Sequence, residues 1–240
     1  MGVCEMKVEL IAHSMGQINL DCTVFPGAVD EHKTQLHLEN VKPTEIVGRA
    51  AGICYDKEEK EDYDTFVRRV IKMGHESVIE HVSFTFRVEG VSRALTHQWV
   101  RHRLCSFSQR SQRYVKETEP SYVMPPMDYL STKGHSDGAP SDKYVAIRKF
   151  EAAMEIAWEA YNQLLKVGVK GEDARFVLPN ACETKMVWTA NARELRHFFK
   201  MRLDKHAQWE IREMAKRMYD LVIELAPALF DDMKSLRDGA

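Results

Sequence analysis

The chain has 240 residues, of which 44% are hydrophobic, 29% charged and 9% aromatic. These are globular values, so a wholly disordered or collagen-like chain is excluded, and one domain over residues 1–240 is expected at this length. With 34 basic and 36 acidic residues the formal net charge is −2. Any anion must therefore be bound by a local cluster of basic side chains.

Neither a membrane segment nor a disulfide framework is expected. No apolar run approaches the roughly 18 residues of a membrane-spanning helix, and the charged first residues lack the core of a signal peptide. The five cysteines are scattered, odd in number and form no CxxC pair. This pattern favours a reducing, cytoplasmic location.

The first half of the chain mixes short strands and helices. The predicted elements are a strand at 7–13, a loop at 21–34, helices at 43–54 and 64–73, a strand at 81–88 and a helix at 92–102. Pro43 suits a helix's first turn, and Asp64 is the expected N-cap of the second helix. Ser77 and Glu80 have the spacing of a capping box.

The second half is mainly helical. The predicted elements are a loop at 131–141, helices at 142–167 and 173–178, a strand at 185–190 and helices at 191–202 and 206–226. The polar, glycine-bearing stretch 131–141 is expected to be a mobile loop. Asn191 has N-cap spacing to Glu194. Separated strands among many helices indicate an α+β fold, a helix-rich single domain with a few-stranded mixed or antiparallel sheet.

Residues 91–115 carry five arginines and two histidines but no acidic residue. Arginine presents a forked set of donors that suits phosphate oxygens. The segment is either a solvated basic loop or an anion-binding site. Trp99, Phe107 and Tyr114 lie among the charges, which favours a site.

The predicted helix 191–202 has two faces. Its basic face holds Arg193, Arg196, His197 and Lys200. Its apolar face holds Leu195, Phe198 and Phe199. Arg202 falls on the apolar side, where it is either a snorkelling residue at the helix end or an arginine held in a pocket to meet an anion.

Other chemistries find little support in the sequence. His75, Glu80 and His81 lack the HExxH spacing, so no metal site is expected. No GxGxxG, P-loop or GxSxG motif is present, which disfavours a Rossmann-type dinucleotide enzyme. Cys105 and Ser111 have no evident base nearby in sequence, so packing and anion binding are favoured over nucleophilic roles.

Arg101-His102-Arg103, followed after seven residues by Ser111, resembles the RHR-x7-S signature of the flavin-dependent thymidylate synthases, also called thymidylate synthase complementing proteins. Further blocks at 74–81, 174–179, 191–193 and 206–210 agree in order and spacing. The resemblance implies a homotetramer with shared active sites that methylates dUMP to dTMP. It further implies methylenetetrahydrofolate as the carbon donor and reduced FAD, reloaded by NADPH, as the hydride donor.

The resemblance also implies the site residues. It assigns FAD binding to Ser77, Glu80, Arg101, His102, Arg103, Gln109, Asn191, Arg193 and His197. It assigns dUMP binding to Gln98, Arg101, Gln109, Ser111, Arg113, Arg175 and Arg202. Arg202 is the expected catalytic residue, because its charge can favour negative charge developing on the uracil ring. Gln109 stands where many members have glutamate, and His197 where asparagine is common.

Two rival functions remain at this stage. The arginine-aromatic stretch 91–115 could serve an RNA-binding module, and a flavoprotein oxidase without synthase activity is the second alternative. A flavin spectrum would separate the enzyme from the RNA-binding module. A dUMP-dependent assay would separate the synthase from the oxidase.

Overall fold

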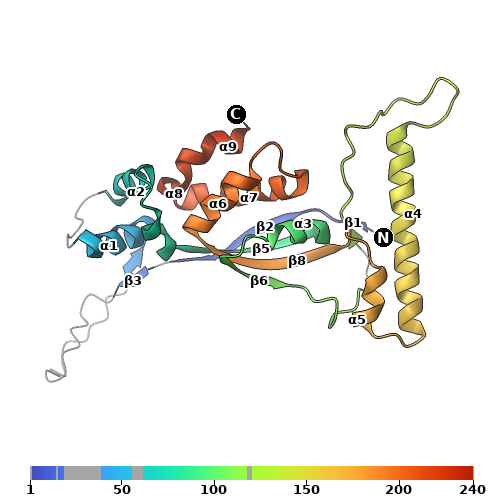
Figure 1. Cartoon of the computed structure of the whole chain (residues 1–240), viewed down its shortest axis with the longest axis horizontal. Helices are drawn as coiled ribbons and strands as arrows, with labels where there is room; N and C mark the ends of the chain where they lie inside the picture. The colour runs from blue at the N-terminus through green and yellow to red at the C-terminus, as the bar shows by residue number, and fades with distance from the viewer. Residues whose placement is uncertain (1, 15, 19–38, 56–61, 118–120, 240) are drawn as a thin grey trace. The chain divides into compact units, whose positions relative to one another are not determined.

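The computed structural model describes residues 2–14, 16–18, 39–55, 62–117 and 121–239. Its elements are labelled in Figure 1. The chain forms two compact units. Unit 1 comprises Met1–Val8, Arg87–Arg101 and Phe107–Trp188, and unit 2 comprises Glu9–Phe86, His102–Ser106 and Thr189–Ala240. The single domain over residues 1–240 stays a prediction.

The main sheet has four strands in the order β2-β5-β8-β6. They are β2 (Lys7–His13), β5 (Ser83–Ser92), β6 (Cys105–Gln109) and β8 (Glu183–Asn191). Strands β5 and β8 run antiparallel: the hydroxyl groups of Thr85 and Thr189 are hydrogen-bonded, and the amide of Ala192 donates to the carbonyl of Val82. The predicted α+β class is thereby confirmed.

Two small sheets complete the strand set of the described residues. β1 (Gly2–Val3) pairs in parallel with β7 (Ser121–Tyr122), and β3 (Gly16–Ile18) pairs antiparallel with β4 (Glu39–Val41).

Strand β5 forms because its sequence alternates strictly. Phe84, Phe86 and Val88 are fully buried, whereas the residues between them are partly or wholly exposed. Near its end, Gly90 has a φ of 70°, and a Cβ there would overlap the carbonyl of Glu5. Glycine is required at this position for both reasons.

Unit 2 is built largely from helices. They are α1 (Pro43–Tyr55), α2 (Tyr63–Lys72), η1 (Glu76–His81), α6 (Ala192–Arg202), α7 (Trp209–Leu225), α8 (Pro227–Phe230), η3 (Asp231–Met233) and α9 (Lys234–Asp238), where η marks a 3-10 helix. Its core contains Phe84, Phe199, Tyr219 and Phe230, with ring centroids 5.5 to 5.8 Å apart. These edge-on aromatic contacts tie β5 to α6, α7 and α8.

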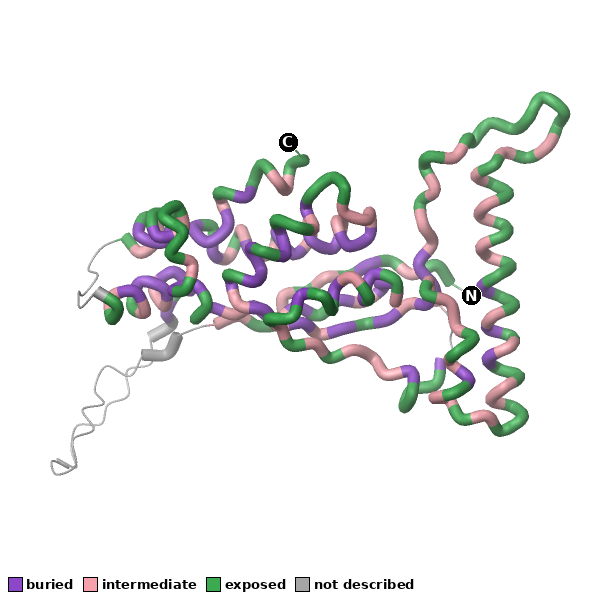
Figure 2. The backbone as a smooth tube through the Cα atoms, in the orientation of Figure 1, coloured by how far each residue is buried: buried purple, intermediate pink, exposed green. Residues whose placement is uncertain are grey.

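Unit 1 contains α3 (Arg93–Trp99), α4 (Asp142–Lys166), α5 (Gly171–Ala174) and the 3-10 helix η2 (Arg175–Val177). Trp99, Phe107 and Trp188 pack together, with the two tryptophan rings 5.4 Å apart. Figure 2 shows α4 buried at few positions. Met154, Trp158 and Tyr161 are the buried ones, as expected for one apolar stripe on an amphipathic helix.

Most predicted elements are confirmed. The strand at 7–13 has the observed bounds, the long helix starts at Asp142 as predicted, and Asn191 caps α6 by accepting from the amide of Glu194. Loop 131–141 contains neither helix nor strand, and its mobility stays a prediction. Loop 21–34 lies outside the described residues.

Three local predictions are wrong. Asp62 caps α2 in place of Asp64, because the Asp62 carboxylate accepts from the amide of Thr65. The capping box at Ser77 and Glu80 does not form, since η1 starts after His75 without a side-chain cap and Glu80 accepts from Arg193. The helix expected at 92–102 ends at Trp99.

Strand β6 and the short helices after residue 226 were not predicted. None of the helices among the described residues is long and apolar enough to span a membrane.

Arg196 of α6 does not lie on an exposed basic face, and this part of the prediction is wrong. Its side chain is only 2% exposed. Its guanidinium donates to both carboxylate oxygens of Asp232, at 2.7 and 2.6 Å, and to the carbonyl of Leu229. This bidentate pair binds α6 to the segment that follows α8.

Asp232→Ala should therefore lower the free energy of unfolding of the protein by about 3 kcal/mol. The buried Arg196 would lose both hydrogen bonds to this carboxylate and keep only Glu76, whose Oε1 lies 3.6 Å from its Nε, as a counter-charge. Chemical denaturation monitored by circular dichroism measures the change. Asp220→Ala is the matched control. Asp220 also accepts two hydrogen bonds from one arginine, Arg237, whose side chain is 32% exposed, so its loss should cost no more than about 1 kcal/mol. Equal losses in the two variants would contradict the assignment.

Candidate active site

Helix α6 supplies four of the polar side chains that line one cavity in unit 2. Because Asn191 fixes the first turn, Glu194, Phe198 and Arg202 follow at i, i+4 and i+8 along one row of the helix. Phe198 is fully buried, Glu194 is 7% exposed and Arg202 is half-buried. The row therefore places a carboxyl group at one end of a buried phenyl ring and a guanidinium group at the other.

The cavity has a volume of about 970 Å³, which is at the upper end for ligand sites. Its lining residues come from η1, β5, β6, β8 and α6. They are Glu76, Glu80, Ser83, Leu104, Cys105, Ser106, Thr189, Ala190, Asn191, Arg193, Glu194, His197 and Lys200. The amino end of α6 opens onto this space, which suits an anionic group.

Charges of both signs line the cavity. Arg193 donates to Glu80. Glu76 lies 3.8 Å from Arg193 and 3.8 Å from Lys200. Arg193 and Lys200 have exposed side chains, so an entering anion can compete with these carboxylates for them.

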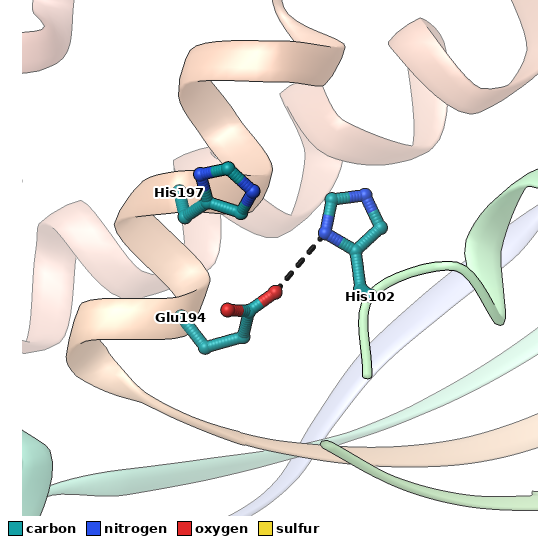
Figure 3. Close-up of side chains that lie close together, drawn as sticks. All are labelled: His102, Glu194 and His197. Carbon is teal, nitrogen blue, oxygen red and sulfur yellow. Dashed lines mark hydrogen bonds and ion pairs between the residues drawn. The ribbon is translucent and has the colours of Figure 1, made fainter. Parts of the chain in front are cut away.

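His102 lies buried between Glu194 and Arg202. Its Nδ1 is 3.1 Å from Oε1 of Glu194, as Figure 3 shows, and its Nε2 is 3.1 Å from Nε of Arg202. The imidazole packs edge-on against Phe198, with centroids 5.0 Å apart. Burial lowers the pKa of His102; the hydrogen bond with Glu194 opposes this shift, and the charge of Arg202 adds to it.

Arg202 is partly desolvated, as its position on the apolar side of the helix predicts. Burial lowers the pKa of its guanidinium, yet arginine stays charged at neutral pH. A cation in a poorly solvated place interacts strongly with an anion brought beside it.

A second group of arginines occurs in unit 1. Arg113 donates through Nε and Nη2 to the carboxylate of Glu172, and Arg175 donates to the carbonyl of the same residue. The hydroxyl of Ser111 accepts from the amide of Arg113. The structure therefore brings together three of the residues predicted to bind dUMP.

Arg93 extends this group inward. It is half-buried and donates to the carbonyl of Arg110, and burial lowers the pKa of its guanidinium. Its Nε is buried without a hydrogen-bond partner among the described residues. Such an atom is costly unless a ligand or water accepts from it.

Cys182 of unit 1 is a buried thiol. Burial raises its pKa to about 12, and the nearby carboxylate of Glu117 adds to the shift. At neutral pH Cys182 is therefore a thiol, which is a poor nucleophile.

Comparison with known proteins identifies the family. Residues 36–228 match the family model for the thymidylate synthase complementing protein. The chain belongs to the thymidylate synthase complementing protein family.

Two of its relatives within this family cover most of the chain. A protein named flavin-dependent thymidylate synthase from Nitratidesulfovibrio vulgaris is 46% identical over 94% of this chain and 86% of its own length. One of the same name from Geobacter sulfurreducens is 44% identical over 79% of this chain and 82% of its own. The crystal structure of the UMP/dUMP methylase PolB from Streptomyces cacaoi, bound with 5-Br dUMP, has a TM-score of 0.74, covering 97% of this chain and 96% of that one. At 24% identity this likeness shows the fold alone.

The positions at which family resemblance predicts FAD contacts are distributed unevenly. Glu80, Asn191, Arg193 and His197 line the cavity, and His102 reaches it through Glu194. Ser77 and Arg103 are exposed residues of unit 2 outside the lining. Arg101 and Gln109 belong to unit 1.

The positions at which it predicts dUMP contacts divide between the units. Ser111, Arg113 and Arg175 form the group described above, which lies in unit 1. Gln98, Arg101 and Gln109 are also residues of unit 1, whereas Arg202 is a residue of unit 2. Gln109 donates to the hydroxyls of Thr96 and Thr184. The Gln109 side chain is thus held by two neutral hydrogen bonds.

Sequence reasoning missed Glu194 and Arg93 as site residues. Glu194 was assigned only a place in the first turn of the helix, although its i, i+4, i+8 spacing to Phe198 and Arg202 is visible in the sequence. Arg93 was noted only as part of the basic segment. Its burial depends on packing in unit 1, for which the sequence carries no local signal.

His102→Gln should remove a pH dependence of stability. The folded-state pKa of His102 is lowered, so the unfolded chain binds more protons once the pH falls below about 6.5. As the pH falls from about 6.5 toward the lowered pKa, the free energy of unfolding of the wild type should decrease by up to about 1.4 kcal/mol per pH unit relative to that of the variant.

Denaturant unfolding between pH 5 and 8 measures this difference. Above about pH 7.5 the two curves should run parallel, which serves as the internal control. A constant offset down to pH 5 would show that His102 is not held neutral.

Proposed function

We propose that the chain is a flavin-dependent thymidylate synthase that converts dUMP to dTMP. In this proposal methylenetetrahydrofolate donates the carbon and reduced FAD, reloaded by NADPH, donates the hydride. The observation that carries the proposal is the half-buried Arg202, held by the central histidine of the Arg101-His102-Arg103 triplet. Family membership and the names of the relatives support it.

The unit 1 arginines suit a nucleotide phosphate. Arg93, Arg110, Arg113 and Arg175 outnumber their acidic neighbours Glu117 and Glu172. Burial raises the pKa of the Glu117 carboxyl, with Arg110 opposing the shift. A phosphate can then accept from guanidinium groups that lack sufficient counter-charge.

The unit 2 cavity suits a flavin nucleotide. Arg193, Lys200 and the amino end of α6 fit a diphosphate, and Asn191 and His197 offer further polar groups. The flavin, when bound, supplies the hydride. The protein's own residues hold the nucleotides, exclude water and provide the local electric field.

Arg202 is assigned to the uracil ring. Because the site needs negative charge on uracil to make its C5 carbon nucleophilic, a poorly solvated cation beside the ring lowers the barrier. No thiolate is required, in keeping with the raised pKa of Cys182.

We also propose a homotetramer with shared active sites in a reducing cytoplasm. Leu104, Tyr114 and Phe176 are large apolar side chains that are 76%, 81% and 82% exposed. They lie close in sequence to the exposed Arg103, to Arg113 and to Arg175. Exposed apolar residues beside ligand-binding ones suit an interface between copies of the chain. Light scattering should give the mass of four chains.

The RNA-binding alternative is weakened by where the aromatic residues lie. Trp99 is fully buried against Phe107 and Trp188, so it cannot stack on a base. Tyr114 is exposed, but single-strand binding modules rely on several such platforms.

The purified protein should be yellow, with flavin absorbance that acid precipitation releases into the supernatant. It should form dTMP only when dUMP, methylenetetrahydrofolate and a reductant are all present. Cys105→Ala and Cys182→Ala should both retain this turnover. A colourless protein carrying nucleic acid would overturn the proposal, and flavin reoxidation without any dTMP would indicate the oxidase.

Arg202→Ala should slow methyl transfer by roughly 10² to 10³, the loss typical of one charge-stabilising donor. It should weaken dUMP binding but leave flavin content and NADPH oxidation largely intact. Arg202→Lys should recover only part of the rate, because an ammonium lacks the planar fork. Rapid-quench kinetics and dUMP titration of the flavin spectrum measure these effects.

Raising the pH should help Arg202→Ala more than the wild type, since a less stabilised uracil loses its proton only at higher pH. Loss of FAD from Arg202→Ala with unchanged dUMP affinity would instead assign this arginine to the flavin.

A further inference from the structure

Glu194, His102 and Arg202 form a linear chain of hydrogen bonds. The two outer residues lie eight positions apart on α6, about 12 Å along the helix axis. His102 bridges them across the ring of Phe198, with both of its nitrogens engaged at 3.1 Å. Figure 3 shows the imidazole facing the Glu194 carboxylate.

One protonation state satisfies all three groups. The Nε–H of Arg202 is always a donor, so Nε2 of His102 must carry a lone pair. A neutral imidazole then has its proton on Nδ1, and Glu194 must accept from it as a carboxylate. A protonated imidazole would point Nε2–H at the arginine donor, with two positive charges facing each other.

A metal ion would be incompatible with this arrangement. His102, Glu194 and His197 have possible ligand atoms within 4.8 Å of one another, which is the donor set of many metal sites. Coordination through Nδ1 of His102 would move its proton to Nε2, opposite the Arg202 donor. Coordination through Nε2 would displace Arg202 altogether.

We propose that Glu194 is a positioning residue that acts through neutral, Nδ1-protonated His102 to orient the guanidinium of Arg202. The inference rests on the proposed function in so far as Arg202 meets the uracil ring. By accepting the Nδ1 proton, the Glu194 carboxylate makes Nε2 of His102 a stronger acceptor. A carboxylate has the same effect on a metal-binding histidine when it accepts from the ring nitrogen that does not bind the metal. The bond that Nε2 of His102 accepts fixes the direction of the Arg202 Nε–H and thereby constrains the plane of the guanidinium.

The tautomer can be read in the resting protein. In ¹⁵N-histidine-labelled protein at pH 7.5, His102 should show a protonated Nδ1 and an unprotonated Nε2, with its signals assigned by their loss in His102→Gln. Glu194→Gln keeps an acceptor and should keep this tautomer. Glu194→Met keeps the length and helix propensity but cannot accept, so the tautomers should mix.

The pH titration separates a relay from a merely structural role. The charged groups facing His102 are Glu194, His197 and Arg202. Because the hydrogen bond to Glu194 raises the pKa of His102, Glu194→Gln should titrate His102 at a lower pH than the wild type. A glutamate that only packs would leave the titration unmoved.

Kinetics then test the consequence for Arg202. Glu194→Met should lower kcat for dTMP formation by about 10- to 100-fold, the usual cost of removing a partner that orients a catalytic group, with flavin content unchanged. Glu194→Gln should recover most of the rate. Glu213→Met is the matched control, because Glu213 accepts from Arg217 on the neighbouring helix α7, outside the cavity, and its loss should leave kcat unchanged.

The outcomes distinguish the two proposals. An Nε2-protonated or doubly protonated His102 at pH 7.5 in the wild type, or Glu194→Met with unchanged tautomer and rate, would overturn the positioning role. If added Zn²⁺ shifts the His102 and His197 signals together, the cluster is a metal site and the relay is wrong. Absence of dTMP formation by the wild type, with the expected tautomer present, would refute the function while leaving the hydrogen-bond chain in place.

Discussion

The strand-to-helix junction at Asn191 is the constraint on which the site depends. The Asn191 side chain accepts from the amide of Glu194, and the amide of Ala192 donates to the carbonyl of Val82, the residue just before strand β5, at 2.7 Å. These two bonds fix where β8 ends and at which angular phase α6 begins. Every later residue of the helix inherits that phase, so Glu194 and Arg202 face His102 while Arg196 turns toward the core. A shift by one residue would rotate the helix by about 100° and separate all these pairs.

The rotational position of α6 also decides which of its arginines are buried. The two buried or half-buried arginines, Arg196 and Arg202, have different partners. Arg196 is neutralised by a bidentate carboxylate and serves stability. Arg202 is partly desolvated too, and it donates through Nε to the imidazole of His102 rather than to a carboxylate. One helix thus carries one arginine that is paired with a carboxylate in the core and another to which we assign the proposed chemistry.

Local signals in the sequence predicted much of this fold. Alternation located β5, and cap chemistry located the starts of α3 and α6, because these depend on neighbours within a few residues. Strand β6 was missed although Cys105 and Phe107 alternate with Ser106 and Ser108, because the segment is only five residues long and lies within the basic stretch. It is held as an edge strand by β8.

For the site, the arginine segment and the row on α6 were visible in sequence, and Arg202 was placed correctly on the apolar side. The partners that decide each role were not, since Asp232 lies 36 residues from Arg196 and His102 lies 92 residues from Glu194. Contacts between residues this far apart in sequence depend on how the elements pack, and no local sequence pattern indicates them.

The division of unit 2 into three separate stretches of sequence has a consequence for how the protein is made. Arg68 pairs with Asp231 across 163 residues, and the whole of unit 1 is encoded between them apart from its first few residues. At about 5 to 20 residues per second of translation, roughly 8 to 30 s pass after Arg68 is synthesised before its partner exists. During that interval the apolar side chains of β5 have emerged, and Phe84 lacks Phe230, the ring that packs edge-on against it in the folded protein. A ribosome-bound chain of this protein therefore presents an uncovered hydrophobic strand for most of its synthesis, which is the kind of segment that chaperones bind.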